Sequence, residues 1–195
     1  MTAPSRRGAL AAIACVIAAP ALAASSGVGS DPLAKRFGGP FALTTHDGRR
    51  VTEADFRGRF LLVFFGFTRC PDVCPTALAT MTSALESLGA AADRVQPVFI
   101  TVDPARDTPP VLAEYVASFH PRLIGLTGSE AEIAAAARAY RVHRVKYAPA
   151  NGGDYAVDHG SLTYLMGPDG GFLTLIPHGA SAEKMAQVLR RYLAG

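Results

Sequence analysis

The sequence contains little cysteine and no strong excess of charge of either sign. Its three cysteines, in a chain of 195 residues, are too few for the disulfide framework that stabilises small secreted domains. Without Arg6 and Arg7 near the N-terminus, 17 of the 19 basic residues remain against 16 acidic residues. A nearly neutral chain lacks the basic surface that nucleic-acid binding requires, so we expect no nucleic-acid partner. There is no internal repeat, and the length fits one domain with a leader.

The first 24 residues have the features of an export signal. The two arginines precede a small-residue apolar segment at 8–19, and residues 21–23 match an A-x-A cleavage site. We therefore predict that residues 1–24 are a signal peptide and that the mature protein starts near Ala24. Two alternatives stay open: the leader is kept as a membrane anchor, or Cys15 is a lipidation site.

All three alternatives place the domain outside the cytoplasm, and we expect a bacterial periplasm. The protein would be soluble there after signal cleavage, or anchored to the inner membrane through its N-terminus. Residues 25–40 are rich in Gly, Ser and Pro and are predicted to form a linker. The folded domain is expected at residues 41–195.

Within this domain, segments typical of strands alternate with segments typical of helices. Apolar runs at 61–67 and 96–102 have the length and composition of buried central strands. Further predicted elements are hairpins near 41–51 and 162–176, a strand at 123–126, and helices at 75–88, 109–119, 129–140 and 181–193. This order, with a dithiol between the first central strand and its helix, predicts an α/β thioredoxin-like fold. A mixed central sheet would be flanked by helices, with an N-terminal hairpin and a late hairpin insertion.

Capping residues mark several of the predicted helix starts. Thr108 and Pro109 are suited to the N-cap and the first helical position. Ser129 and Glu132 form a capping box, and residues 52–55 suggest a brief capped turn.

Two cysteines lie between the first central strand and the helix after it. Cys70 and Cys74 follow the apolar run, and Pro75 is suited to the first position of the helix. Thiols just before a helix N-terminus have a lowered pKa, which favours the reactive or metal-binding thiolate. A close cysteine pair in an oxidising compartment therefore indicates chemistry rather than a stabilising bridge.

The spacing of the pair leaves two kinds of chemistry open. Three residues separate Cys70 from Cys74, whereas a thioredoxin-type redox site has two. The wider loop still permits a disulfide, and it also lets both thiolates face one soft ion. Thiolates favour copper(I) or zinc, and imidazole also suits copper.

A metal site needs at least a third ligand, for which His159 is the best candidate. It lies at the entry to the late hairpin, and a thioredoxin-like fold would place the segment before that hairpin against the cysteine loop. Asp158 could orient the histidine ring as an outer-shell partner or supply an oxygen ligand. The other histidines lie in turns, helix ends or surface runs and are less suited: His46, His120, His143 and His178.

Charged residues flank the cysteines and the second strand. Asp72 and Arg69 could tune the thiol pKa or contact a partner. Three residues follow the predicted central strand at 96–102, and helix caps and loop salt bridges account for them better than catalysis does: Asp103, Arg106 and Asp107. Isolated methionines are interpreted as core or surface residues rather than a methionine copper site: Met81, Met166 and Met185.

Three segments together resemble the motifs of the SCO/SenC copper-binding proteins. Residues 66–76 (GFTRCPDVCPT) are similar to the family's cysteine motif, and residues 102–109 (VDPARDTP) to its second signature. Residues 157–159 (VDH) with 164–170 (YLMGPDG) resemble the third. The resemblance extends over about residues 41–193, with the three motifs in the family's order.

The resemblance implies a protein that binds one copper ion through Cys70, Cys74 and His159. Copper(I) would be near-trigonal, and copper(II) would take a fourth donor such as Asp158 or water. The implied role is maturation of the dinuclear copper centre of cytochrome c oxidase subunit II, as metallochaperone, thiol reductant or both. Implied partners are that subunit, a copper donor chaperone and the thiol reductant of the compartment.

Other functions compete with copper delivery. A thiol–disulfide oxidoreductase would use the cysteines alone, although we expect a binding protein rather than an enzyme. A peroxidase needs a threonine three residues before its reactive cysteine, where this chain has Phe67 or Pro71. A copper or redox sensor is a third alternative.

Overall fold

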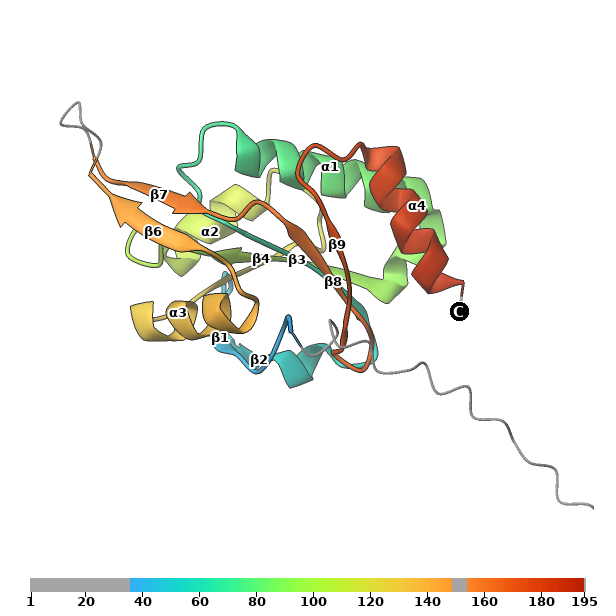
Figure 1. Ribbon diagram of the computed structural model, residues 1–195, viewed down its shortest axis with the longest axis horizontal. Coiled ribbons are helices and arrows are strands. Elements are labelled where there is room, and N and C mark those ends of the chain that lie inside the picture. Colours follow the sequence, from blue (N-terminus) through green and yellow to red (C-terminus); the bar gives the residue numbers. More distant parts are fainter. Residues whose placement is uncertain (1–35, 149–153, 195) are drawn as a thin grey trace, which may run out of the picture.

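The computed structural model describes residues 36–148 and 154–194 (Figure 1). The predicted leader with Cys15, most of the predicted linker and residues 149–153 lie outside the described residues. Over the ranges that are described, no helix has the length and apolar character needed to cross a membrane.

A mixed seven-stranded sheet forms the centre of the domain, in the order β2-β1-β5-β4-β3-β8-β9. The central strands β3, β4 and β5 are parallel, whereas β1 and β8 join them antiparallel. The strands of this sheet are β1 (Ala42–Thr45), β2 (Arg50–Thr52), β3 (Phe60–Gly66), β4 (Val95–Thr101), β5 (Ile124–Thr127), β8 (Thr163–Met166) and β9 (Phe172–Ile176). The predicted α/β thioredoxin-like class and both predicted hairpins are confirmed.

Helices cover both faces of the sheet because its central strands are buried on both faces. One core cluster packs beneath α1 (Val73–Leu88), α2 (Pro109–Val116) and α4 (Ala182–Leu193). The other contains side chains of α3 (Glu130–Ala139) and of the short 3-10 helix η1 (Glu53–Phe56). A second 3-10 helix, η2 (Gly89–Arg94), leads into β4. In Figure 1, α1 and α4 lie on one side of the sheet and α3 on the other.

The predicted caps are present, but the start of α1 differs from the prediction. The capping boxes at Thr52 and Ser129 both form, and Thr108 is the N-cap of α2. Helix α1 begins at Val73, so Pro75 occupies the third helical position rather than the first. Proline fits there because the first four N–H groups of a helix have no partner within it. As a result, Cys74 lies inside the first turn of α1.

A separate two-stranded sheet carries the candidate histidine. Strands β6 (Arg144–Tyr147) and β7 (Ala156–His159) pair antiparallel, and no ladder joins them to the seven-stranded sheet within the described residues. Of this hairpin, Val157 packs into the core while Val145 and Tyr147 face solvent. Figure 1 shows the hairpin at the end of the molecule remote from the C-terminal end of α4.

Candidate metal centre

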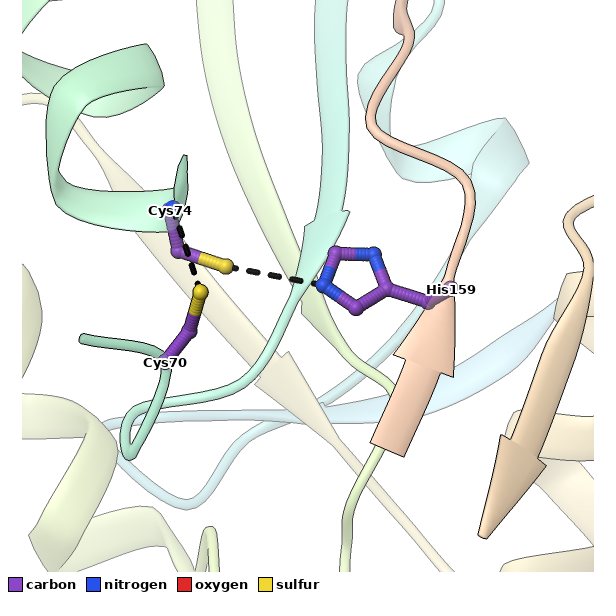
Figure 2. A group of neighbouring side chains, drawn as sticks. All are labelled: Cys70, Cys74 and His159. Carbon is purple, nitrogen blue, oxygen red and sulfur yellow. Dashed lines mark hydrogen bonds between the residues drawn. The ribbon is translucent and has the colours of Figure 1, made fainter. Parts of the chain in front are cut away.

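Three different elements bring Cys70, Cys74 and His159 together (Figure 2). Cys70 lies in the loop after β3, Cys74 in the first turn of α1, and His159 at the end of β7. One potential ligand atom from each residue lies within 4.8 Å of the other two. The Cys74 Sγ to His159 Nε2 distance is 3.7 Å, and both cysteines are free thiols.

The cysteine loop is held by contacts at its beginning. Strand β3 ends at Gly66, and the Phe67 ring packs edge-on against His159 with ring centroids 5.7 Å apart. The next residue, Thr68, donates its backbone N–H and its hydroxyl to the buried carboxylate of Asp107, over 3.0 and 2.6 Å. The loop that leads to Cys70 is therefore fixed before the chain enters α1.

The surroundings of Cys70 stabilise its thiolate. The Cys74 thiol donates a hydrogen bond to the Cys70 sulfur, which is the largest cause of a Cys70 pKa of about 5. The backbone N–H groups of Cys74, 3.4 Å from Cys70 Sγ, and of Asp72 lower this pKa further. These amides belong to the N-terminus of α1, where unpaired N–H groups and the helix dipole favour an anion. Partial burial of Cys70 opposes the shift without reversing it.

Cys74 has the opposite character. Its hydrogen bond to Cys70 raises the Cys74 pKa, because ionisation would break that bond, and burial raises this pKa further. The residue is fully buried, whereas Cys70 is partly exposed. Without a metal, the pair thus holds one thiolate on Cys70 and one proton on Cys74.

This asymmetry predicts the alkylation chemistry of the apoprotein. Iodoacetamide should modify Cys70 before Cys74, because the thiolate is the nucleophile and only Cys70 combines exposure with a lowered pKa. The Cys70 rate should be nearly constant from about pH 6 to 8 and fall below about pH 5, as protonation consumes the thiolate. Peptide mass spectrometry with time-resolved quenching measures both rates. A rate that climbs about tenfold per pH unit, as for a thiol of ordinary pKa, would contradict the assignment.

The hydrogen bond of His159 leaves one ring nitrogen free for a metal. Its Nδ1 lies 3.0 Å from the backbone carbonyl oxygen of Gly160. A carbonyl oxygen only accepts, so this contact places the proton on Nδ1 and leaves the lone pair of Nε2 facing the thiols. A backbone carbonyl is a common outer-shell partner of metal-binding histidines.

The predicted role of Asp158 as the partner of the His159 ring is not found. The Asp158 carboxylate lies 3.3 Å from His143 Nε2 and is largely exposed. Adjacent residues of a strand point to opposite faces, so Asp158 faces away from the side chain of His159. Asp72, the other predicted outer-shell residue, is the exposed N-cap residue of α1, and it acts on Cys70 through its backbone N–H.

The spacing of the donor atoms fits a single metal ion. Bonds of about 2.3 Å to sulfur and about 2.0 Å to nitrogen, separated by about 120°, would place those two ligand atoms about 3.7 Å apart. The Cys74 Sγ to His159 Nε2 distance equals this value. The donor set of two thiolates and one imidazole is soft, which suits copper(I).

The remaining predicted residues have structural contacts. His46 and His120 each accept a backbone N–H at Nδ1, and neither belongs to the Cys–His group. Asp103, Arg106 and Asp107 form buried hydrogen bonds and an ion pair, consistent with their interpretation as structural residues. Met81, Met166 and Met185 are buried in the core.

Sequence reasoning did not single out Gly66 and Tyr155. Gly66 lies within the apolar run at 61–67 and is the last residue of β3, and a glycine inside a strand pattern is a known signal of close approach. A Cβ on Gly66 would lie 2.7 Å from Cys74 Sγ. Tyr155 contacts Asp103 and Arg106 across about 50 positions of sequence, a relation that no local pattern shows.

Comparison with known proteins places this geometry in a family. Residues 29–194 match the SCO1/SenC family model. The mouse (Mus musculus) Protein SCO2 homolog, mitochondrial, is 46% identical over 158 residues, covering 80% of this chain and 62% of the relative. The chain spans about three fifths of the length of the curated relatives it matches.

Solved structures agree with the family match. The copper-bound structure of ScoI from Bradyrhizobium japonicum is 46% identical with a TM-score of 0.74, covering 80% of this chain and 99% of that chain. BsSco, described as having a disulfide switch and as a member of the Sco family of cytochrome c oxidase assembly proteins, is 28% identical with a TM-score of 0.67. That match covers 84% of this chain and 96% of BsSco. The chain belongs to the SCO1/SenC family.

Proposed function

We propose that this protein binds one copper ion through Cys70, Cys74 and His159 and delivers it during assembly of the dinuclear copper centre of cytochrome c oxidase. The observation that carries the proposal is the convergence of two sulfurs and one imidazole nitrogen within 4.8 Å. The copper-bound ScoI structure and the description of BsSco as an oxidase assembly protein support it.

The donor set suits copper as a cargo that is bound and released. Copper(I) would be held by two thiolates and the Nε2 of His159 in a near-trigonal site. Copper(II) would need a fourth donor, and we assign water to this position because the carboxylate of Asp158 faces His143. Partial exposure of Cys70 and His159 gives a partner's ligands access to the metal for stepwise exchange.

Thiol reduction is a second candidate function, favoured by the unequal pKa values of the two cysteines. The Cys70 thiolate would attack a disulfide of the target, releasing one target thiolate and forming a mixed disulfide. Cys74, once it has lost its proton, would then attack Cys70 and release the second target thiol. The target gains two electrons, and the Cys70–Cys74 pair loses them as it becomes a disulfide. Because that disulfide removes both thiolates, the redox state would also control copper loading.

The proposed setting is the bacterial periplasm, with the domain soluble or tethered by its N-terminus. The charged start, apolar segment and A-x-A sequence of residues 1–24 support export. The proposed partners are cytochrome c oxidase subunit II, a copper donor chaperone and a thiol reductant that regenerates the cysteines.

An anaerobic copper(I) titration of the reduced protein against a chelator tests the proposed function. We expect one tightly bound copper per chain and a loss of affinity of at least about 10–100-fold in His159→Ala, because even outer-shell losses have that effect. The Cys70–Cys74 disulfide should still form in this variant. His178→Ala is the matched control, since His178 is exposed and outside the Cys–His group.

Two results would contradict the proposed function. Equal copper affinity in His159→Ala and the unmodified chain would remove His159 from the ligand set. Failure of the unmodified chain to compete for copper, together with fast disulfide exchange on a peptide carrying two cysteines, would assign the protein to the oxidoreductases.

A further inference from the structure

The β6–β7 hairpin, which carries His159, contacts the rest of the domain mainly through charged and aromatic side chains. No backbone ladder joins β6 or β7 to the seven-stranded sheet within residues 36–148 and 154–194. On the sheet side, the contacts come from the loop after β4 and from the start of α3. For example, Arg144 of β6 donates to the Val102 carbonyl and forms an ion pair with Glu130. The position of His159 therefore depends on side-chain contacts at both ends of the hairpin, with Arg144 opposite His159 and Tyr155 directly before β7.

Arg106 makes the most extensive of these contacts. Its guanidinium bonds to the Asp103 carboxylate through Nε, and its Nη1 donates to the Tyr155 carbonyl over 2.9 Å. Its Cζ lies 3.7 Å from the centroid of the Tyr155 ring, a distance typical of a strong cation–π contact. Nη1 also reaches the Asp154 carboxylate over 3.1 Å, and Arg69 of the cysteine loop binds the same oxygen over 2.9 Å. Arg106 thus contacts the backbone carbonyl of Tyr155, the ring of Tyr155 and the carboxylate of Asp154, all in the segment that leads into β7.

Asp103 completes the attachment from the other side. It is fully buried, and its Oδ1 accepts the hydroxyl of Tyr155 over 2.7 Å. Lys146 of β6 places its Nζ 3.3 Å from the same oxygen. Asp103 therefore holds Tyr155, Arg106 and β6 through one carboxylate, in a buried setting where loss of a partner is costly. We call Asp103, Arg106 and Tyr155 the hairpin clamp.

The hairpin clamp lies at the opposite end of β7 from His159. Tyr155 directly precedes this strand, and His159 ends it, so about 13 Å of extended chain separates them. The Phe67 ring fills the space between, 6.0 Å from Arg106 Cζ and in edge contact with His159. A shift of the beginning of β7 would tilt the strand and move Nε2 relative to the two sulfurs, and metal–ligand bonds tolerate errors of only about 0.2 Å.

We propose that the hairpin clamp positions His159 against Cys70 and Cys74, so that the third ligand is preorganised before metal arrives. The three clamp residues are positioning residues that touch no metal. The inference rests on the proposed copper function, but it concerns the placement of His159, which is measurable in the apoprotein. Without the clamp, the two thiols keep their geometry, because the loop and α1 that carry them are fixed by Thr68 and Asp107.

A double-mutant cycle between the hairpin clamp and His159 tests the inference. Arg106→Met removes the charge and the hydrogen bonds but keeps an unbranched side chain. When His159 is present, we expect Arg106→Met to weaken copper(I) binding about tenfold, which is the lower end of outer-shell effects. In the His159→Ala protein, the same substitution should change the copper affinity by less than about twofold. Tyr155→Phe, which loses only the hydroxyl bond to Asp103, should show the same pattern with a smaller effect. Arg49→Met is the control, since the Arg49–Asp47 pair is exposed.

The apoprotein supplies an independent measurement. In Arg106→Met, NMR should show changed chemical shifts of the His159 ring protons, because the ring moves relative to Phe67, and faster hydrogen exchange of the amides of β6 and β7. Equal losses of copper affinity in both backgrounds, or a folded variant with unchanged His159 resonances, would overturn the inference. If Arg106→Met does not fold, Tyr155→Phe decides the test. If the unmodified chain binds no copper, the proposed function fails and the NMR comparison still decides the clamp.

Discussion

Replacing Asp107 with alanine is expected to lower the free energy of unfolding by about 3 kcal/mol or more. The Asp107 carboxylate is fully buried and accepts three hydrogen bonds, two from Thr68 and one of 2.6 Å from the Thr101 hydroxyl. Alanine would leave these donors without their acceptor, and each unsatisfied buried donor costs about 1–3 kcal/mol. Water entering the space would recover part of this loss, so the three costs are not expected to add fully.

Chemical denaturation of the reduced protein measures the effect, with Asp93→Ala as the matched control. Asp93 is exposed, and its ion pair with Arg122 is long, at 3.6 Å. The loss of Asp93 should therefore change the free energy of unfolding by less than about 0.5 kcal/mol. The Asp107 variant should also lose order at the beginning of the cysteine loop, because Asp107 accepts both the backbone N–H and the hydroxyl of Thr68 there. A change below about 1 kcal/mol in Asp107→Ala would show that these donors find other partners.

Replacing Gly66 with alanine is expected to cost about 1–3 kcal/mol, the usual price of overpacking a core. The new Cβ would lie 2.7 Å from Cys74 Sγ, 2.8 Å from the Phe99 ring and 3.1 Å from the Phe64 ring. All three neighbours are fully buried and have no solvent-exposed space to move into. Alanine would gain about 0.4–1 kcal/mol from a less flexible unfolded chain, but the steric cost is larger.

The Gly66 variant should also disturb the cysteine pair, since the Cys74 sulfur is the atom most crowded by the new Cβ. We expect slower disulfide formation and weaker copper(I) binding, together with the lower midpoint of denaturation. Gly160→Ala is the stability control, because a Cβ there meets nothing within 4 Å and the backbone has no positive φ. Unchanged stability in Gly66→Ala would mean that β3 and α1 separate easily at this point.

Elements with a local signal were predicted well from the sequence. The apolar runs of β3 and β4 are buried at every position, as their composition indicates. The capping box of Ser129 and Glu132 forms where its spacing predicts. Each of these signals is contained within a few neighbouring residues, so it does not depend on how distant segments of the chain pack.

The errors came from features that depend on the local backbone. Proline at the first helical position is a preference, and the third position is equally free of a hydrogen-bond requirement, so α1 could begin two residues earlier than Pro75 suggests. The prediction for Asp158 treated a neighbour in sequence as a neighbour in space. A strand separates the side chains of adjacent residues, and the partner of the His159 ring is the backbone carbonyl of Gly160.

The contact of Tyr155 with the other two residues of the hairpin clamp had no local signal. Asp103 and Arg106 are three positions apart, and their ion pair was foreseeable, but Tyr155 joins them only after the chain has passed through α2, β5, α3 and β6. Composition and spacing describe single segments, whereas this contact depends on how a separate two-stranded sheet packs against a loop.

The two-stranded sheet is separate from the seven-stranded sheet, so the third metal donor, His159, is carried by a different structural unit from the two cysteines. The seven-stranded scaffold supplies both sulfurs, while the nitrogen arrives on a hairpin that shares no ladder with it in the described residues. The residue at position 159 can therefore be replaced without changing the scaffold, as long as the contacts of Tyr155 and Val157 with it are kept. We expect a change of the donor at position 159 to alter metal preference more than the stability of the seven-stranded sheet.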